Sequence, residues 1–233
     1  MNQLELFSEH KNETPLATIN YFINDTNKKL SGLPGLDGLF ELSVDAYYTA
    51  IYAIMSELPI KEEISHFIKK VGKTRDRKAA DKAAFDRGDP DVHTVLKAAY
   101  KVQHEIHRLT GLLRFSPDNK GVYVARCSPD HFVLPALAEH FTLRFGETPW
   151  AIIDEKRRFC LYRDKYGEAS LMPAVSDSAF GSCAQTEYEE PADPWEELWR
   201  LYHRSINNEG KKNLRLQRQF MPERYHKYLP EMK

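Results

Sequence analysis

The feature that most constrains the fold is a long amphipathic helical pattern near the middle of the chain. It follows Asp89-Pro90, in which the aspartate is a typical N-cap and the proline suits the first helical turn. Gly111 is expected to end this helix. The apolar stripe consists of residues at helical spacing, namely Val92, Val95, Leu96, Ala99, Val102, Ile106 and Leu109.

The N-terminal part has helical patterning of the same kind. Helices are predicted at about 44–56 and 61–71, after a loop indicated by glycine and proline between 32 and 38. The strongly charged stretch 73–91 predicts an exposed helix or connector. We therefore expect several helices to precede the first strand.

The second half of the chain has the pattern of a small β-α-β-β unit. An alternating stretch predicts a strand, an apolar stripe predicts a helix, and two β-rich runs joined by a charged turn predict a strand pair, with a short strand after it. Ser128-Pro129 is expected to start the helix. In chain order the elements are 121–126, 134–145, 150–153, 159–162 and 168–172.

This order predicts an α+β fold: N-terminal helices, a small antiparallel β-α-β-β sheet unit and C-terminal helices packed on it. We expect a mobile tail at 1–15 and a single domain at 16–233. Within that domain, 173–192 is predicted to be an irregular acidic loop and 193–233 to form basic helices.

Composition excludes several classes of protein. The 233 residues are 42% hydrophobic and 29% charged, which excludes collagen-like and low-complexity chains. No apolar run approaches the roughly 18 residues of a membrane span, and the first eleven residues lack the features of a signal peptide. The dispersed Cys127, Cys160 and Cys183 indicate reduced thiols. We expect a cytoplasmic protein that does not engage membranes.

Charge is segregated although the formal net charge is only −1. Residues 168–197 hold eight acids and no lysine or arginine, whereas 198–233 hold nine bases and three acids. Basic residues mixed with aromatics suit a phosphate backbone and its bases, although a solvated helical face would show the same pattern. The candidate nucleic-acid residues are Arg204, Lys211, Lys212, Arg215, Arg218, Arg224, Tyr202 and Tyr225.

A second candidate site is a set of histidine, arginine and aspartate side chains in the central region. If the central helices pack on the sheet, these groups could converge on a basic pocket that holds a phosphate, with a histidine as proton donor. Ion pairs on helix surfaces would explain the same residues. The candidate catalytic residues are His107, Arg108, His140, Arg144 and Asp154.

The sequence lacks the signatures of the well-marked enzyme classes. It contains no GxxxxGK[ST], GxGxxG, HExxH or GxSxG motif. Histidines and carboxylates do not occur at spacings that bring metal ligands together locally, and the cysteines are not spaced for an iron–sulfur cluster. We therefore predict no metal site and no cofactor.

The N-terminal tail contains a short recognition-like motif. The segment QLELF, at residues 3–7, closely resembles the pentapeptide by which bacterial repair and replication proteins bind the sliding clamp. Leu6 and Phe7, with Leu4, would fill an apolar pocket while Gln3 forms hydrogen bonds at its rim. The same apolar residues could instead fold back onto the core.

From about residue 40 to 230 the chain resembles an uncharacterised bacterial family of DNA-metabolism or DNA-repair proteins, a domain of unknown function. Residues 1–35 depart from the family pattern, as do Lys211 and Lys212, where an arginine is common. The matching pieces are EIHR (105–108), GLLRF (111–115), VYVA (122–125), SPDH (128–131), EHF (139–141), RF (144–145), WAIIDEKR (150–157), LWRLY (198–202), MPERY (221–225) and LPE (229–231), with Asn213 and Gln217.

The resemblance implies a role in DNA metabolism but no established reaction or catalytic residue. Family members are typically encoded beside a radical-SAM protein with a helix-hairpin-helix segment, and some are fused to uracil-DNA glycosylase-like domains. The leading hypothesis is therefore a DNA-binding repair accessory that works with the radical-SAM protein and is recruited by the sliding clamp. The alternatives are an enzyme acting on damaged DNA or a nucleotide, and a protein scaffold for the radical-SAM partner.

Overall fold

The central element of the fold is α6 (Pro90–Leu112), a helix about 34 Å long at 1.5 Å per residue. The computed structural model describes residues 35–174, 194–206, 210 and 213–232. The Asp89 carboxylate caps α6 by accepting hydrogen bonds from the backbone N–H groups of Asp91 and Val92, and Pro90 occupies the first turn, as predicted. The helix continues through Gly111, so the prediction that this glycine ends it is wrong by one residue.

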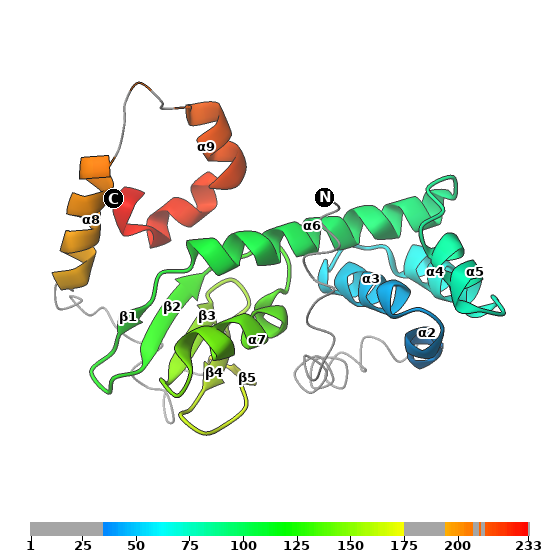
Figure 1. Ribbon diagram of the computed structural model, residues 1–233, viewed down its shortest axis with the longest axis horizontal. Helices are drawn as coiled ribbons and strands as arrows, with labels where there is room; N and C mark the ends of the chain where they lie inside the picture. Colours follow the sequence, from blue (N-terminus) through cyan, green and yellow to red (C-terminus); the bar gives the residue numbers. More distant parts are fainter. Residues whose placement is uncertain (1–34, 175–193, 207–209, 211–212, 233) are drawn as a thin grey trace.

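The first half of α6 packs against a layer of N-terminal helices (Figure 1). The contacts join the predicted apolar stripe of α6 to buried residues such as Ile51 and Phe67. The helix that precedes α3 lies where the sequence indicated only a loop. The elements of this layer are α2 (Leu36–Leu42), α3 (Val44–Met55), α4 (Lys61–Gly72) and α5 (Arg77–Ala84).

The second half of α6 leads into a five-stranded sheet with strand order β1-β2-β3-β4-β5. Three of the four strand pairings are antiparallel, but β2 and β3 run parallel because α7 (Leu134–Phe145) connects them as a crossover. The predicted all-antiparallel unit is therefore corrected at this pair. The strands are β1 (Ser116–Pro117), β2 (Tyr123–Cys127), β3 (Trp150–Asp154), β4 (Phe159–Arg163) and β5 (Ser170–Pro173).

Helix α7 begins at Leu134, six residues after the predicted cap at Ser128, so residues 128–133 form a loop at the end of β2. Its buried face packs on the sheet through an aromatic cluster in which Phe141 contacts the rings of Phe115 and Trp150. These contacts confirm the α+β class and place a continuous core between α6, α7 and one face of the sheet.

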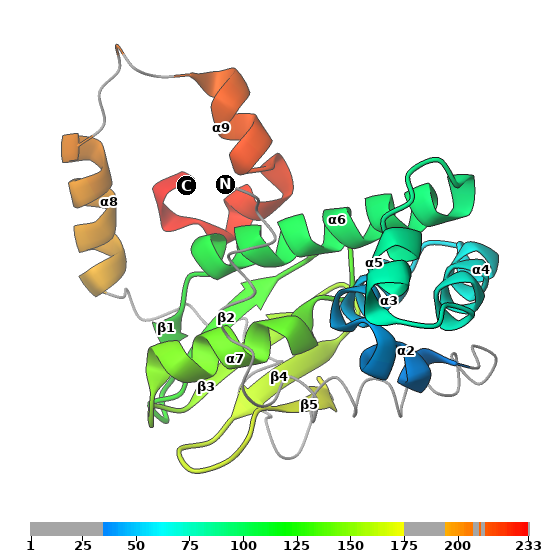
Figure 2. The ribbon, with the colours of Figure 1, turned by 45° about the vertical axis from the view of Figure 1, so that its right-hand side comes forward.

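The C-terminal part consists of two helices that stand away from the sheet and two short 3₁₀ segments (Figures 1 and 2). The segment that contacts the end of β2 is η3, and α8 packs against η4. Among the described residues, no helix is long and apolar enough to cross a membrane. The bounds are α8 (Pro194–Ile206), α9 (Leu214–Phe220), η3 (Glu223–Tyr228) and η4 (Pro230–Met232).

Replacing Phe141 with alanine tests the aromatic core. Phe141 is fully buried, so Phe141→Ala should lower the free energy of unfolding by about 3–5 kcal/mol, measured by urea denaturation. The matched control is Leu143→Ala on the same helix, because Leu143 is exposed and its truncation should change stability by less than about 0.5 kcal/mol. Equal effects of the two variants would contradict this packing.

Candidate functional site

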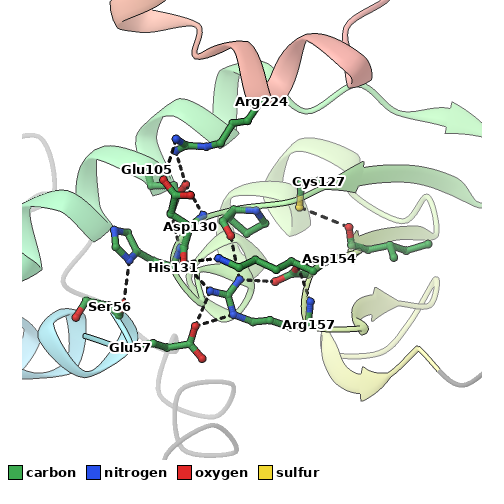
Figure 3. Close-up of polar contacts among 12 residues, drawn as sticks. Ser56, Glu57, Glu105, Cys127, Asp130, His131, Asp154, Arg157 and Arg224 are labelled. Atoms are coloured by element: carbon green, nitrogen blue, oxygen red, sulfur yellow. Dashed lines mark hydrogen bonds and ion pairs between the residues drawn. The ribbon is translucent and has the colours of Figure 1, made fainter. Parts of the chain in front are cut away.

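The most concentrated group of polar side chains lies where the parallel strands β2 and β3 end. Carboxyl ends of parallel strands are common ligand sites in α/β sheets, so this edge is the natural place to look for chemistry. Two loops meet here, residues 128–133 after β2 and residues 155–158 after β3, next to Asp154 at the end of β3. We call the group the polar joint; its members are Glu57, Glu105, Asp130, Asp154, Arg157 and Arg224 (Figure 3).

Glu105 is the buried centre of one half of the polar joint. Its Oε1 accepts hydrogen bonds from the Asp130 amide (2.9 Å), from Arg224 Nη2 (2.8 Å) and from the Tyr225 hydroxyl (2.6 Å). Its Oε2 accepts the His131 amide at 2.8 Å. Four donors therefore converge on one carboxylate: two backbone amides from the loop after β2 and two side chains from η3.

Asp154 and Arg157 form the other half. Asp154 is fully buried and accepts hydrogen bonds from the Lys156 and Arg157 amides and, at 2.9 Å, from Arg157 Nη1. The same guanidinium donates to the Glu57 carboxylate (2.8 Å from Nε) and to the carbonyls of Pro129 and Asp130. Arg157 thus ties the turn after β3 to the loop after β2 and to the end of α3.

The backbone around the polar joint adopts the left-handed region, which is rare for non-glycine residues, at two positions. Glu57, two residues after the end of α3, has a φ of 56°, and Arg158, in the turn after β3, has a φ of 57°. In the same region the His131 Nδ1 lies 2.9 Å from the Ser56 carbonyl oxygen, and the Phe132 amide donates to the Met55 carbonyl. The end of α3 is therefore fastened to the loop after β2.

The pKa of Glu105 reflects two opposing effects. Burial by itself raises the pKa of this carboxyl, but the Tyr225 hydroxyl and the Asp130 and His131 amides favour the charged form, and the net pKa is lowered. Burial, with the nearby Asp154 and Glu105 charges, raises the pKa of the Cys127 thiol well above its usual range. Cys127 is therefore an inert thiol and not a nucleophile.

This geometry describes a structural connection better than a catalytic centre. The carboxylates of Glu105 and Asp154 are occupied by donors from the chain itself, so neither offers a free oxygen to a substrate. The polar joint links α3, α6, the loop after β2, the turn after β3 and η3. Its ion pairs and hydrogen bonds hold the helical layer, the sheet and the C-terminal segment together.

The predicted catalytic residues are distributed over three elements. His107 and Arg108 lie on α6, where Arg108 Nη2 donates to the Gln219 carbonyl at 2.8 Å. His140 and Arg144 are exposed on α7, and Asp154 is buried beside Arg157. Within the described residues, no hydrogen bond or ion pair joins Asp154 to the other four. The enzyme hypothesis stays a prediction without a shared pocket to support it.

The predicted nucleic-acid residues fall into three groups. Arg204 and Tyr202 on α8 are exposed, as are Arg215 and Arg218 on α9. Arg224 instead pairs with Glu105 and, at 2.8 Å, with Asp130, and Tyr225 is only 2% exposed, so its ring has no free face for a base. The remaining two, Lys211 and Lys212, lie outside the described residues, as do the tail residues Gln3, Leu4, Leu6 and Phe7.

One cluster has the composition of a metal site. The ligand atoms of His66, Asp89 and Asp91 lie within 4.8 Å of one another at the start of α6. The Lys70 ammonium, 2.8 Å from Asp89, already supplies a positive charge to this group. The arrangement is that of a surface ion-pair network that also caps the helix.

Sequence reasoning missed the connection between these residues. Glu105, His131 and Arg157 do carry a local signal, because they lie in the motifs EIHR, SPDH and WAIIDEKR. Glu57 carries no comparable local signal, and Arg224 lies 119 residues after Glu105. Only the folded chain brings these partners together.

Comparison with protein-family models matches residues 60–231 to DUF4130, a domain of unknown function. The chain belongs to the DUF4130 family. No curated protein and no solved structure shows significant similarity to it. The DUF4130 match runs from the loop before α4 to η4 and contains five members of the polar joint, while Glu57 lies just before it.

Replacing Glu105 with glutamine tests the central contact of this DUF4130 protein. Glu105→Gln keeps the shape but removes the charge that Arg224 and Tyr225 face, so the free energy of unfolding should fall by about 1.5–3 kcal/mol at neutral pH. Because the folded-state pKa is lowered, the carboxylate contributes fully above the ordinary glutamate pKa and loses its contribution as pH falls through the folded value.

The measurement is urea denaturation of both proteins over a pH series. The difference in stability should be largest at neutral pH and should shrink in acid. Glu147→Gln, at an exposed position after α7, is the control and should behave as the parent at every pH. A difference that does not change with pH would show that the Glu105 charge is not what stabilises the joint.

Proposed function

We propose that this protein binds DNA through an exposed surface on α8 and α9, as an accessory in DNA repair. The observation that carries the proposal is that α8 and α9, two helices that stand away from the sheet, expose basic and aromatic side chains. We call this the C-terminal basic surface; its described members are Tyr202, Arg204, Arg215 and Arg218. Lys211 and Lys212 are added from the sequence alone.

The charges on this surface are available to a polyanion. Among the residues that the structure describes, Arg218 pairs with the Glu223 carboxylate at 3.3 Å, and both side chains are largely exposed. A surface pair of this kind contributes about 0–1 kcal/mol, so a phosphate can replace the carboxylate at little cost. Arg224 and Arg157, by contrast, are held by buried carboxylates and are not counted as DNA contacts.

The wider biological role is part of the same proposal. Family resemblance supports DNA repair together with a radical-SAM helix-hairpin-helix protein, and the expectation of a cytoplasmic location comes from the sequence features of the N-terminal region. The QLELF segment at residues 3–7 supports recruitment by the sliding clamp. In this arrangement the clamp and the partner bring the protein to its site, and the C-terminal basic surface holds the DNA.

The proposal predicts a salt-dependent affinity that charge reversal weakens. Fluorescence anisotropy of labelled DNA over a salt series should show that the logarithm of the affinity falls linearly with the logarithm of salt concentration. The double variant Arg204→Glu and Arg215→Glu should bind more weakly. Its slope should be shallower by about 0.9 per lost contact on duplex DNA, or about 0.7 on a single strand.

The matched control is the double variant Lys61→Glu and Lys69→Glu, two charge reversals at exposed positions on α4, at the far end of α6 from α9 (Figure 1). It changes the net charge in the same sense but should leave the slope as it is. If both variants weaken binding equally, the attraction comes from overall charge and the surface assignment is wrong. No binding by the parent protein at low salt would overturn the proposed function.

A further inference from the structure

The geometry points to a preference of the C-terminal surface for nucleic acid with unpaired bases, which stack on Trp199 and Tyr202. This inference rests on the proposed function, because it names the form of DNA that the surface selects. Trp199 is not a member of the C-terminal basic surface and enters the argument through its own contacts. Three observations on α8 and η4 carry it.

The first observation is that the Trp199 ring is held in a fixed position. Its Nε1–H donates to Glu231 Oε2 at 3.0 Å, and Glu231 Oε1 accepts from Arg114 Nη2 at 2.6 Å. The Arg114 guanidinium carbon lies 5.6 Å from the centre of the Trp199 ring. Arg114, which lies just after α6, and Glu231 of η4 therefore orient the indole of α8 through its N–H and its π system.

The second observation is that Trp199 is still 40% exposed although its N–H already binds Glu231. A tryptophan that served only the core would be covered, as Trp150 is in the sheet. An ordered, uncovered aromatic surface of this kind loses little entropy when a flat ligand stacks on it.

The third observation is that a second aromatic ring lies beside the first. Tyr202 is 53% exposed, and the centre of its ring lies 5.8 Å from that of Trp199 at an interplanar angle of 39°. The two rings come from consecutive turns of α8 and so present a continuous aromatic area. Arg204 follows on the same helix and supplies an exposed positive charge for the phosphate chain.

Together these features fit an unpaired nucleotide better than a duplex. In a duplex the faces of the bases are covered by their neighbours, so aromatic side chains cannot stack on them unless the helix opens. In a single strand every base has a free π face, and stacking on an aromatic residue is tolerant of sequence. The Arg204 charge suits the phosphates of both single-stranded and duplex DNA. The preference for unpaired bases therefore comes from the Trp199 and Tyr202 rings.

The test compares three ligands of one sequence: a labelled single strand, its duplex with the complement, and a single strand in which the bases are replaced by abasic sites. Trp199→Ala and Tyr202→Ala should each weaken binding of the single strand by roughly 5- to 150-fold, the range expected for one lost stack. Binding of the duplex and of the abasic strand should stay within the error of the parent protein.

Two further variants separate stacking from folding and from general apolar contact. Trp199→Phe keeps an aromatic ring without the N–H bond to Glu231 and should restore most of the single-strand affinity if α8 is intact. Leu201→Ala removes an exposed aliphatic side chain from the same helix and should have no effect. Circular dichroism of each variant confirms that the helices are retained.

The outcomes distinguish this inference from the proposed function. If the parent binds all three ligands alike and Trp199→Ala changes none of them, while charge reversal at Arg204 and Arg215 still weakens binding, the DNA-binding surface stands and the stacking inference is wrong. If Leu201→Ala weakens binding as much as Trp199→Ala, general apolar contact replaces stacking. If the parent binds no DNA, both proposals fall.

Discussion

The carboxylate of Glu105 receives hydrogen bonds from the loop after β2 and from η3, and most of the architecture depends on this contact. A buried carboxylate is costly unless its lone pairs are occupied, and here four donors occupy them. Two of those donors belong to Arg224 and Tyr225 of η3, the 3₁₀ segment near the C-terminus. Helix α6, which carries Glu105, thus holds the sheet and the C-terminal segment in place relative to each other.

Arg157 connects the sheet to the N-terminal helices as well. It binds Asp154 within its own turn and Glu57 at the end of α3, so the sheet is tied to the helical layer by charge as well as by apolar packing. Because the carboxylates of Glu105 and Asp154 are satisfied within the chain, the polar joint connects elements of the fold and offers neither carboxylate to a substrate. The surface that we propose for recognition lies instead on α8 and α9.

The main consequence for function is that some arginines are paired within the fold, whereas others are exposed. Arg114, Arg157 and Arg224 are fixed by carboxylates and carbonyls, whereas Arg204 and Arg215 are exposed on helices beyond the core. A count of basic residues in the C-terminal sequence treats both kinds alike. Glu231 shows how the two are coupled, since it holds Arg114 and also orients Trp199 at the edge of the exposed region.

Local pattern in the sequence determined most of the helices and strands and the α+β class, because periodicity, caps and turns are properties of neighbouring residues. It also located the motifs that contain Glu105, His131 and Arg157. Strand direction at β2 and β3 was decided by the crossover through α7, a property of the packed chain. The same holds for Tyr225, predicted as a stacking residue but buried against Glu105, 120 residues away. Partners so distant in sequence leave no local signal, and their pairing exists only once the core has brought them together.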